Sequence, residues 1–220
     1  GQGSAGVAAI DKRHFELSLP RGMGGIMGKA RLEAFSDGVL AIIITIMVLE
    51  LKVPHGESIA TLGPLLPAFL SYVLSFIYVG IYWNNHHHML HASKKVSGRV
   101  LWANLHLLFW LSLLPFATGW MGENHFAALP SALYGTILLA AAIAYWLLQQ
   151  AIIAIEGPGS MLAAAVGHDW KGKLSPVLYF AAIVSTAWRP WIAQAIYVVA
   201  ALIWVVPDRR IEHVLSEGGT

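Results

Sequence analysis

The feature that most constrains this chain is a series of long apolar runs, separated by charged residues or by turn-forming glycine and proline. A bilayer core about 30 Å thick is crossed by a helix of about 20 apolar residues. Runs of this kind occur at about residues 31–53, 64–92, 98–120, 130–155, 174–187 and 190–206. The fifth run is short, so a tilted or broken helix is expected there. The pattern predicts an all-α, polytopic membrane protein with six transmembrane helices per subunit.

The composition agrees with this fold class and excludes others. Hydrophobic residues make up 57% of the chain and charged residues 12%, whereas soluble domains average about 45–50% and about 25%. The net charge of +2 leaves too few basic residues to bind a phosphate backbone, so no nucleic-acid partner is expected. The chain has no cysteine, which excludes disulfides, thiolate metal sites and cysteine catalysis.

The distribution of lysine and arginine predicts the orientation, because positively charged short loops stay in the cytoplasm. With six crossings and the N-terminus inside, the inner segments hold twelve of these residues and the outer segments hold two, Lys52 and Arg189. We therefore expect both termini in the cytoplasm. Residues 1–30 would form one tail, 31–207 the transmembrane domain and 208–220 a second tail. Residues 1–30 contain no long apolar segment, so no cleavable signal peptide is expected.

The first apolar run carries polar residues that are candidates for function, because ionisable groups are costly inside a membrane. Arg31, Glu33 and Asp37 fall in its inner turns, and Thr45 is the one polar side chain between Asp37 and Glu50. At 100° per residue, one stripe of the helix collects seven residues. They are Phe35, Gly38, Ile42, Thr45, Ile46, Leu49 and Val53. Ser36 and Asp37 point away from this apolar stripe. Ordinary contact with lipid or with other helices is the alternative interpretation of the stripe.

Three groups of residues resemble a known family. Arg31, Phe35, Ser36 and Asp37 resemble the arginine-x-x-x-phenylalanine-serine-aspartate signature of the transmembrane protein 175 potassium channels, in their bacterial form. Two further patterns of that family have counterparts later in the chain. One is a tryptophan-x-asparagine-histidine-histidine pattern, and the other is a helix that runs from an asparagine to a proline-phenylalanine pair. These are Trp83, Asn85, His86 and His87 for the first, and Asn104, Pro115, Phe116 and Thr118 for the second. The last three apolar runs match the family in hydropathy and length alone.

The resemblance implies a homotetramer whose first helices line a central potassium pore in the bacterial plasma (inner) membrane. The narrow isoleucine layer would fall on Ile42, the hydroxyl layer on Thr45 and an outer apolar layer on Leu49, with Ile46 between them. Apolar rings can act as a hydrophobic gate by dewetting. Hydroxyls at one level replace only part of an ion's hydration, so potassium would be preferred to sodium modestly. Ser36 and Asp37 would bond to His86, His87 or Asn85 and hold the pore helix. Two alternatives remain open: Asp37 as a solvated carboxylate, and Thr45 bonded within its own helix.

The histidines are the strongest candidates for a cofactor site, although no cofactor is expected apart from the permeant potassium ion. Three successive histidines, at positions 86–88, point in different directions on a helix and cannot form one metal site. His87 and His91, four residues apart, could share an ion or a haem. Only His106 lies on another apolar run to complete such a site, so packing and hydrogen bonding is the preferred interpretation.

Two other classes of function compete with a passive channel. A secondary transporter or proton-coupled carrier would show inverted repeats and charge-lined broken helices; no repeat relates the two halves of this chain. An intramembrane enzyme would need convergent ligands or a nucleophile and base pair, which the adjacent residues Ser36 and Asp37 cannot form. The sequence therefore favours a potassium channel over a transporter, and a channel over an enzyme.

Overall fold

A computed structural model describes residues 23–167 and 170–205, and every regular element within them is helical. The elements are α1 (Met23–Leu49), the 3-10 helix η1 (Ile59–Leu65), α2 (Leu66–Ala92), α3 (Gly98–Ser112), α4 (Leu114–Glu123), α5 (Ala128–Glu156), α6 (Met161–Gly167), α7 (Trp170–Ser185) and α8 (Pro190–Val205). The first helix thus begins at Met23 rather than at Arg31. The rest of the expected N-terminal tail, residues 1–22, and the expected tail at 208–220 lie outside the described residues.

Four stretches of the described chain are long and apolar enough to cross a membrane: Gly28–Leu49, Ile59–Ala92, Gly98–Glu123 and Ala128–Glu156. Helices α7 and α8 have 16 residues each. At a rise of 1.5 Å per residue, such a helix is about 24 Å long, which is less than the thickness of a typical bilayer core. The first four predicted spans therefore have membrane-spanning length, whereas the last two are shorter.

The third predicted span is divided into two helices. Helix α3 ends at Ser112 and α4 begins at Leu114, with Pro115 in the first turn of α4. Proline has no backbone N–H and fits best in the first turn of a helix, so the chain restarts there. The Ala117 N–H still donates to the Leu113 carbonyl at 3.1 Å, and the two helices continue as one stretch of apolar chain.

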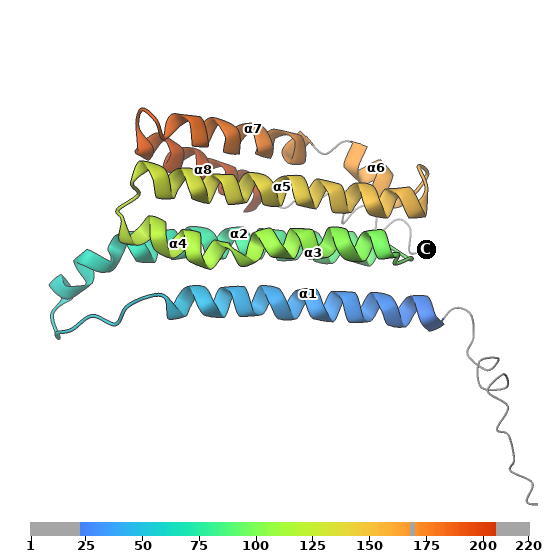
Figure 1. Ribbon diagram of the computed structural model, residues 1–220, viewed down its shortest axis with the longest axis horizontal. Helices are drawn as coiled ribbons and strands as arrows, with labels where there is room; N and C mark the ends of the chain where they lie inside the picture. The colour runs from blue at the N-terminus through green and yellow to red at the C-terminus, as the bar shows by residue number, and fades with distance from the viewer. Residues whose placement is uncertain (1–22, 168–169, 206–220) are drawn as a thin grey trace, which may run out of the picture.

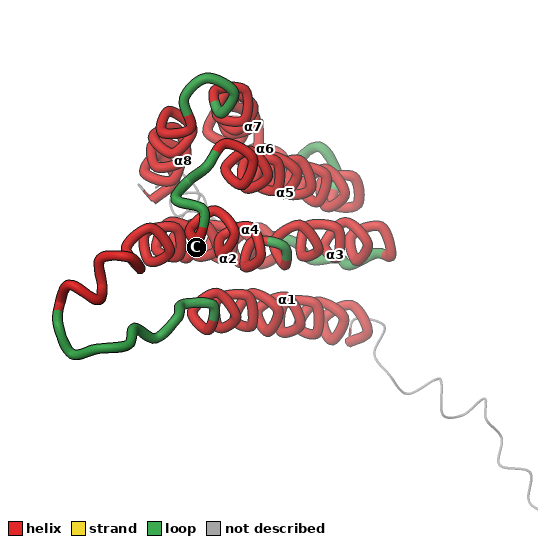
Figure 2. The backbone as a smooth tube through the Cα atoms, turned by 60° about the vertical axis from the view of Figure 1, so that its left-hand side comes forward, coloured by secondary structure: helices red, strands yellow, loops and turns green. Residues whose placement is uncertain are grey.

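The helices form layers, with α1 along one edge of the molecule and α7 and α8 at the opposite edge (Figure 1). Helices α2, α3 and α4 lie between α1 and α5 in two views turned by 60° (Figures 1 and 2). Helix α1 packs against α2, α3 and α4, and α5 packs against α3, α4, α7 and α8. The centre of the core lies on α2 to α5, where Val79, Leu107, Leu138 and Leu148 are fully buried.

Polar contacts fix one end of this bundle. The Glu156 carboxylate, at the end of α5, accepts hydrogen bonds from the backbone N–H groups of Lys94 and Lys95 at 2.7 and 2.8 Å. Lys29 near the start of α1 donates to the carbonyl of His91 at 3.0 Å. The start of α1, the end of α2 and the end of α5 therefore lie at the same end of the molecule.

Candidate functional site

The two faces of α1 have different surroundings. Five residues spaced three or four apart are buried against α2, α3 and α4: Leu32, Ser36, Leu40, Ile43 and Met47. The spacing is that of one face of a helix. The residues of the predicted apolar stripe from Phe35 to Leu49 lie on the other face and are exposed, and Val53, also exposed, follows the end of the helix. Helix α1 therefore packs into the subunit with one face, while the second face is left exposed by the described residues.

The exposed face contains the residues expected to line a pore. The exposed fraction of the side chain is 58% for Ile42, 42% for Ile46 and 77% for Leu49. A contiguous apolar patch on a protein surface marks contact with a membrane or with another protein chain. This helix face can therefore meet lipid, or the same face of other subunits.

Thr45 is the hydroxyl on this face. Its Oγ1 donates a hydrogen bond to the Ala41 carbonyl, one turn earlier in α1, at 2.9 Å, and the side chain is exposed. The own-helix bond that the sequence left open is thus present. It uses the proton of the hydroxyl and leaves the oxygen lone pairs available as acceptors. An oxygen held in this way can still replace a water molecule next to a cation.

The buried face of α1 is held by a directional chain of hydrogen bonds. His86 Nε2 lies 2.6 Å from Asn104 Oδ1, and because that oxygen only accepts, the histidine donates. Asn104 Nδ2 donates to Ser36 Oγ at 2.9 Å, and Ser36 Oγ donates to the Leu32 carbonyl at 2.8 Å. His86, Asn104 and Ser36 are all buried. One residue from each of α1, α2 and α3 therefore forms a fully paired network, which is the arrangement in which buried polar groups add specificity.

Asp37 makes a different contact from Ser36, although the sequence grouped the two. Ser36 is completely buried, whereas Asp37 is exposed at the flank of α1. Its carboxylate accepts a hydrogen bond from Trp83 Nε1 at 3.0 Å. The expected partners were His86, His87 and Asn85. Ser36 reaches His86 only through Asn104, and Asn85 Nδ2 donates to the Ile81 carbonyl of its own helix instead.

The remaining histidines stack rather than converge. His87 lies between Trp83 and His91, with ring centroids 6.2 and 6.0 Å apart, and the His87 and His91 rings are nearly parallel. His106 accepts a hydrogen bond from Trp110 in its own helix. Within the described residues, no group of three or more His, Cys, Asp or Glu side chains could hold a metal ion.

The remaining motif residues, Arg31 and Phe35, lie at the start of the exposed face. Together with Leu101 and Leu105 of α3, they line a cavity of about 580 Å³. The Arg31 side chain is exposed, so it stands beside α3 and outside the buried network.

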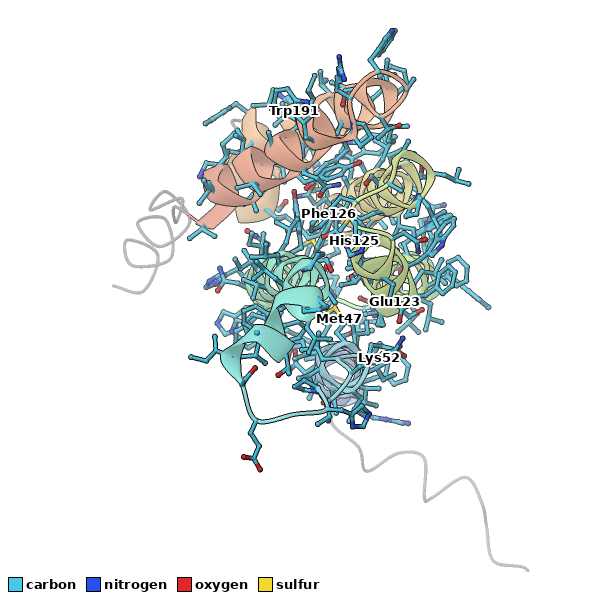
Figure 3. The ribbon with its side chains drawn as sticks, turned by 90° about the vertical axis from the view of Figure 1, so that its left-hand side faces the viewer. Met47, Lys52, Glu123, His125, Phe126 and Trp191 are labelled. Carbon is cyan, nitrogen blue, oxygen red and sulfur yellow. The ribbon has the colours of Figure 1, made fainter. Side chains whose placement is uncertain are left out.

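At the other end of α1, an ion pair ties the chain to α4. Lys52 pairs with Glu123, and the two residues lie close together near the buried Met47 in Figure 3. The hydrogen bond and the charge of Glu123 raise the pKa of Lys52 above its ordinary value. Both side chains are more than half exposed, so the pair positions the chain more than it stabilises it. No motif in the sequence indicated this contact.

The sequence also missed a cluster of tyrosines far from α1. Tyr78 and Tyr134 meet edge to face with ring centroids 6.4 Å apart, and Tyr134 meets Tyr197 at 5.4 Å. Tyr78 donates to the Tyr197 carbonyl, and Ser75 bridges Tyr134 to Thr118. These residues join α2, α4, α5 and α8, but they are scattered in sequence and form no recognisable spacing.

Known proteins are similar to this chain over the residues that form the site. The family described as endosomal/lysosomal potassium channel TMEM175 matches residues 31–115, a range that includes Arg31, Asp37, His86 and Asn104. A protein named as a potassium channel from Chryseobacterium sp. (strain P1-3) is 58% identical over 191 residues, which are 87% of this chain and the whole of that protein. A second, from Streptomyces collinus, is 35% identical over 126 residues, 52% of this chain and 60% of that protein.

A solved structure has a similar fold. The crystal structure of a lysosomal potassium-selective channel TMEM175 homologue from Chamaesiphon minutus superposes with a TM-score of 0.70 at 28% identity. The match covers 82% of this chain and 97% of that one. Together with the four apolar stretches of membrane-spanning length, this similarity makes the chain a multi-pass, all-helical membrane protein.

Proposed function

This chain is a bacterial-type member of the TMEM175 channel family, and from that premise we propose that it is a potassium-permeable ion channel with a modest preference for potassium over sodium. The observation that carries the proposal is the exposed face of α1. It is apolar from Phe35 to Leu49 and interrupted by the single hydroxyl of Thr45, while the opposite face is fixed by the network of Ser36, Asn104 and His86.

A single α1 cannot enclose a pore, so the proposed channel is an oligomer. The resemblance to the family implies a homotetramer, in which four exposed faces surround the central axis. Symmetric homo-oligomers use the same patch on every subunit. The other long helices also expose large apolar side chains, and it is the resemblance to the family that assigns the exposed face of α1 to the central axis. In this assembly α7 and α8 complete six crossings per subunit. Both termini lie in the cytoplasm of the bacterial cell, because twelve of the fourteen lysines and arginines then lie on the inner side.

The gate is the apolar ring of Ile42. Four isoleucine side chains form a constriction that excludes water when it narrows, as hydrophobic constrictions in channels do. One turn away, four Thr45 oxygens present lone pairs while their protons stay on the Ala41 carbonyls. Ile46 and Leu49 continue the apolar lining outward. With so few oxygens, selectivity comes mainly from the cost of removing water from the ion, so potassium, which holds its water less strongly, is preferred modestly.

The other motif residues keep the pore helix in position. His86 and Asn104 anchor Ser36, and Trp83 anchors Asp37. These contacts fix the buried side of α1, so that its exposed face has the same height and rotation in all four subunits. No resident metal or organic cofactor is needed: potassium is the cargo.

Ion flux in liposomes tests the proposal. The purified protein would be reconstituted into voltage-clamped liposomes with a potassium gradient, and reversal potentials would be measured as sodium replaces potassium on one side. We expect passive currents whose reversal potential follows the potassium gradient, with sodium carrying a smaller current. Saturable flux coupled to a second ion would favour a secondary transporter instead, and the absence of flux would reject both.

A further inference from the structure

A cavity of about 330 Å³ lies between α2, α5, α7 and α8, away from α1. In Figure 1, α5, α7 and α8 lie on the side of the molecule opposite α1, and α2 lies in the layer between them and α1. The cavity falls in the size range of small-molecule sites, about 300–1,000 Å³. Aromatic rings form much of its lining: Tyr82, Tyr145, Trp146 and Tyr179. Trp146 and Ile143, at the edge of the cavity, are 54% and 45% exposed, so the cavity is accessible from the apolar surface of α5.

Two polar side chains in the lining have no hydrogen-bond partner among the described residues. Gln149 and Tyr82 are each only 8% exposed. No side-chain nitrogen or oxygen of the described residues is both fully enclosed and unpaired, so the polar atoms of these two residues reach open space, and both residues line the cavity. Other buried polar side chains, such as Ser75 and Thr118, are paired with each other. Because these polar atoms open into the cavity and are not sealed inside the protein, a guest in the cavity can form hydrogen bonds with them.

The chemistry of these groups defines the guest. A glutamine amide and a tyrosine hydroxyl both donate and accept, and both are uncharged. Asn85 adds a further amide, of which one N–H is used by the Ile81 carbonyl. The nearby cation, Lys173, is exposed at the rim and already interacts elsewhere in the protein. An uncharged head group with hydroxyl and carbonyl oxygens fits the two inner groups, and an apolar chain fits the walls.

We propose that this cavity binds a neutral amphiphile of the acylglycerol type from the membrane. Its glycerol head bonds to Gln149 and Tyr82, and its acyl chain lies against Trp146 and Ile143. Tyr82 and Asn85 flank Trp83 on α2, so the guest contacts the helix whose other residues hold α1. The proposal concerns binding alone and does not depend on the protein being a channel.

Thermal stability of the full-length protein in detergent tests this site, with three probes that share an oleoyl chain. Monooleoylglycerol has a neutral head, oleic acid an anionic one and oleoyl-lysophosphatidylcholine a zwitterionic one. We expect saturating monooleoylglycerol to raise the melting temperature by roughly 5 °C, a shift set by mass action and protein size. The other two probes should raise it less.

Matched variants locate the effect. Gln149→Leu should abolish the shift, whereas Gln150→Leu, on the exposed neighbour, should keep it. Ala142→Phe places a larger side chain in the cavity from α5 and should also abolish the shift. Because this variant keeps Gln149, it shows that the shift depends on the cavity and not on a side effect of the leucine substitution. An equal shift in wild type, Gln149→Leu and Ala142→Phe would overturn the proposal, because binding would then lie elsewhere. A larger shift with oleic acid than with monooleoylglycerol would also overturn it and would favour a site for anions at Lys173. If no probe shifts the melting temperature, the cavity binds none of these amphiphiles and the proposal is wrong.

Discussion

On one face of α1 the side chains of Leu40, Ile43 and Met47 are almost fully buried, while on the other Ile42 and Leu49 are more than half exposed. Both faces are equally apolar, so hydrophobicity does not distinguish them. What differs is the polar residue that each contains. Ser36 on the buried face is paired with another helix, whereas Thr45 on the exposed face bonds within α1. In α1, the face that packs inside the subunit is thus distinguished by the buried Ser36 to Asn104 hydrogen bond and not by greater hydropathy.

The largest effect is expected from breaking the buried face. Asn104→Leu removes both bonds of the bridge and leaves His86 buried without its acceptor, which costs about 1–3 kcal/mol. We expect the variant to lose most of its assembled form in size-exclusion chromatography. His106→Leu, on the exposed side of α3, is the matched control and should assemble normally. If both variants assemble like wild type, the network does not hold α1.

The second prediction concerns the exposed face. Ile42→Asn places four amides at the proposed constriction, keeps it wet and should raise the leak conductance several-fold in single-channel recordings. Ile42→Leu preserves an apolar ring and should retain the low leak. Conductance and open probability unchanged in the asparagine variant would place the constriction at another residue.

Particular residues show how far the sequence predicts the buried and the exposed face of α1. The spacing of three and four residues correctly collected Phe35, Ile42 and Leu49 on one face, because that face has one regular period. It could not show that Ser36 and Asp37, adjacent in sequence, separate into a buried and an exposed contact. Asn104 was identified only as a motif residue, since its role as a bridge depends on how α1, α2 and α3 cross in space.

The helix bounds show a similar limit. Hydropathy located four stretches of membrane-spanning length, but the break between α3 and α4 arises from Pro115 in a continuous apolar run. The start of α1 at Met23 precedes the apolar run, because a helix can continue beyond the segment that a membrane covers. The tyrosine cluster and the Lys52 to Glu123 pair were not predicted, since partners distant in sequence leave no periodic signal.

A third prediction concerns Asp37, which lies between the buried and the exposed face of α1. Asp37→Ala removes the acceptor of Trp83 and should lower the yield of assembled protein more than it alters selectivity. Trp83→Phe removes the donor, and the double variant should be no worse than either single one, as expected for a pair that acts together. Normal assembly with altered ion preference would mean that the Asp37 carboxylate faces the pore.

The smallest expected effect is at Thr45. Thr45→Val keeps the shape of the side chain and removes the oxygen, so the preference for potassium over sodium should fall while the protein still assembles. Thr45→Ser retains the oxygen and should stay close to wild type. The readout is the reversal potential in mixed potassium and sodium. A valine variant as selective as wild type would leave Thr45 as a helix residue and move selectivity to the Ile42 layer.

The claim that the exposed face of α1 lines the pore is tested most directly with single cysteines, since the chain has none of its own. Met47 and Leu49 lie at nearly the same depth but on opposite faces, 2% and 77% exposed. Currents from Met47→Cys and Leu49→Cys channels would be recorded before and after a positively charged methanethiosulfonate reagent is added at the outer side. We predict that the reagent abolishes most of the Leu49→Cys current and leaves the Met47→Cys current unchanged. Block of Met47→Cys without block of Leu49→Cys would contradict the account.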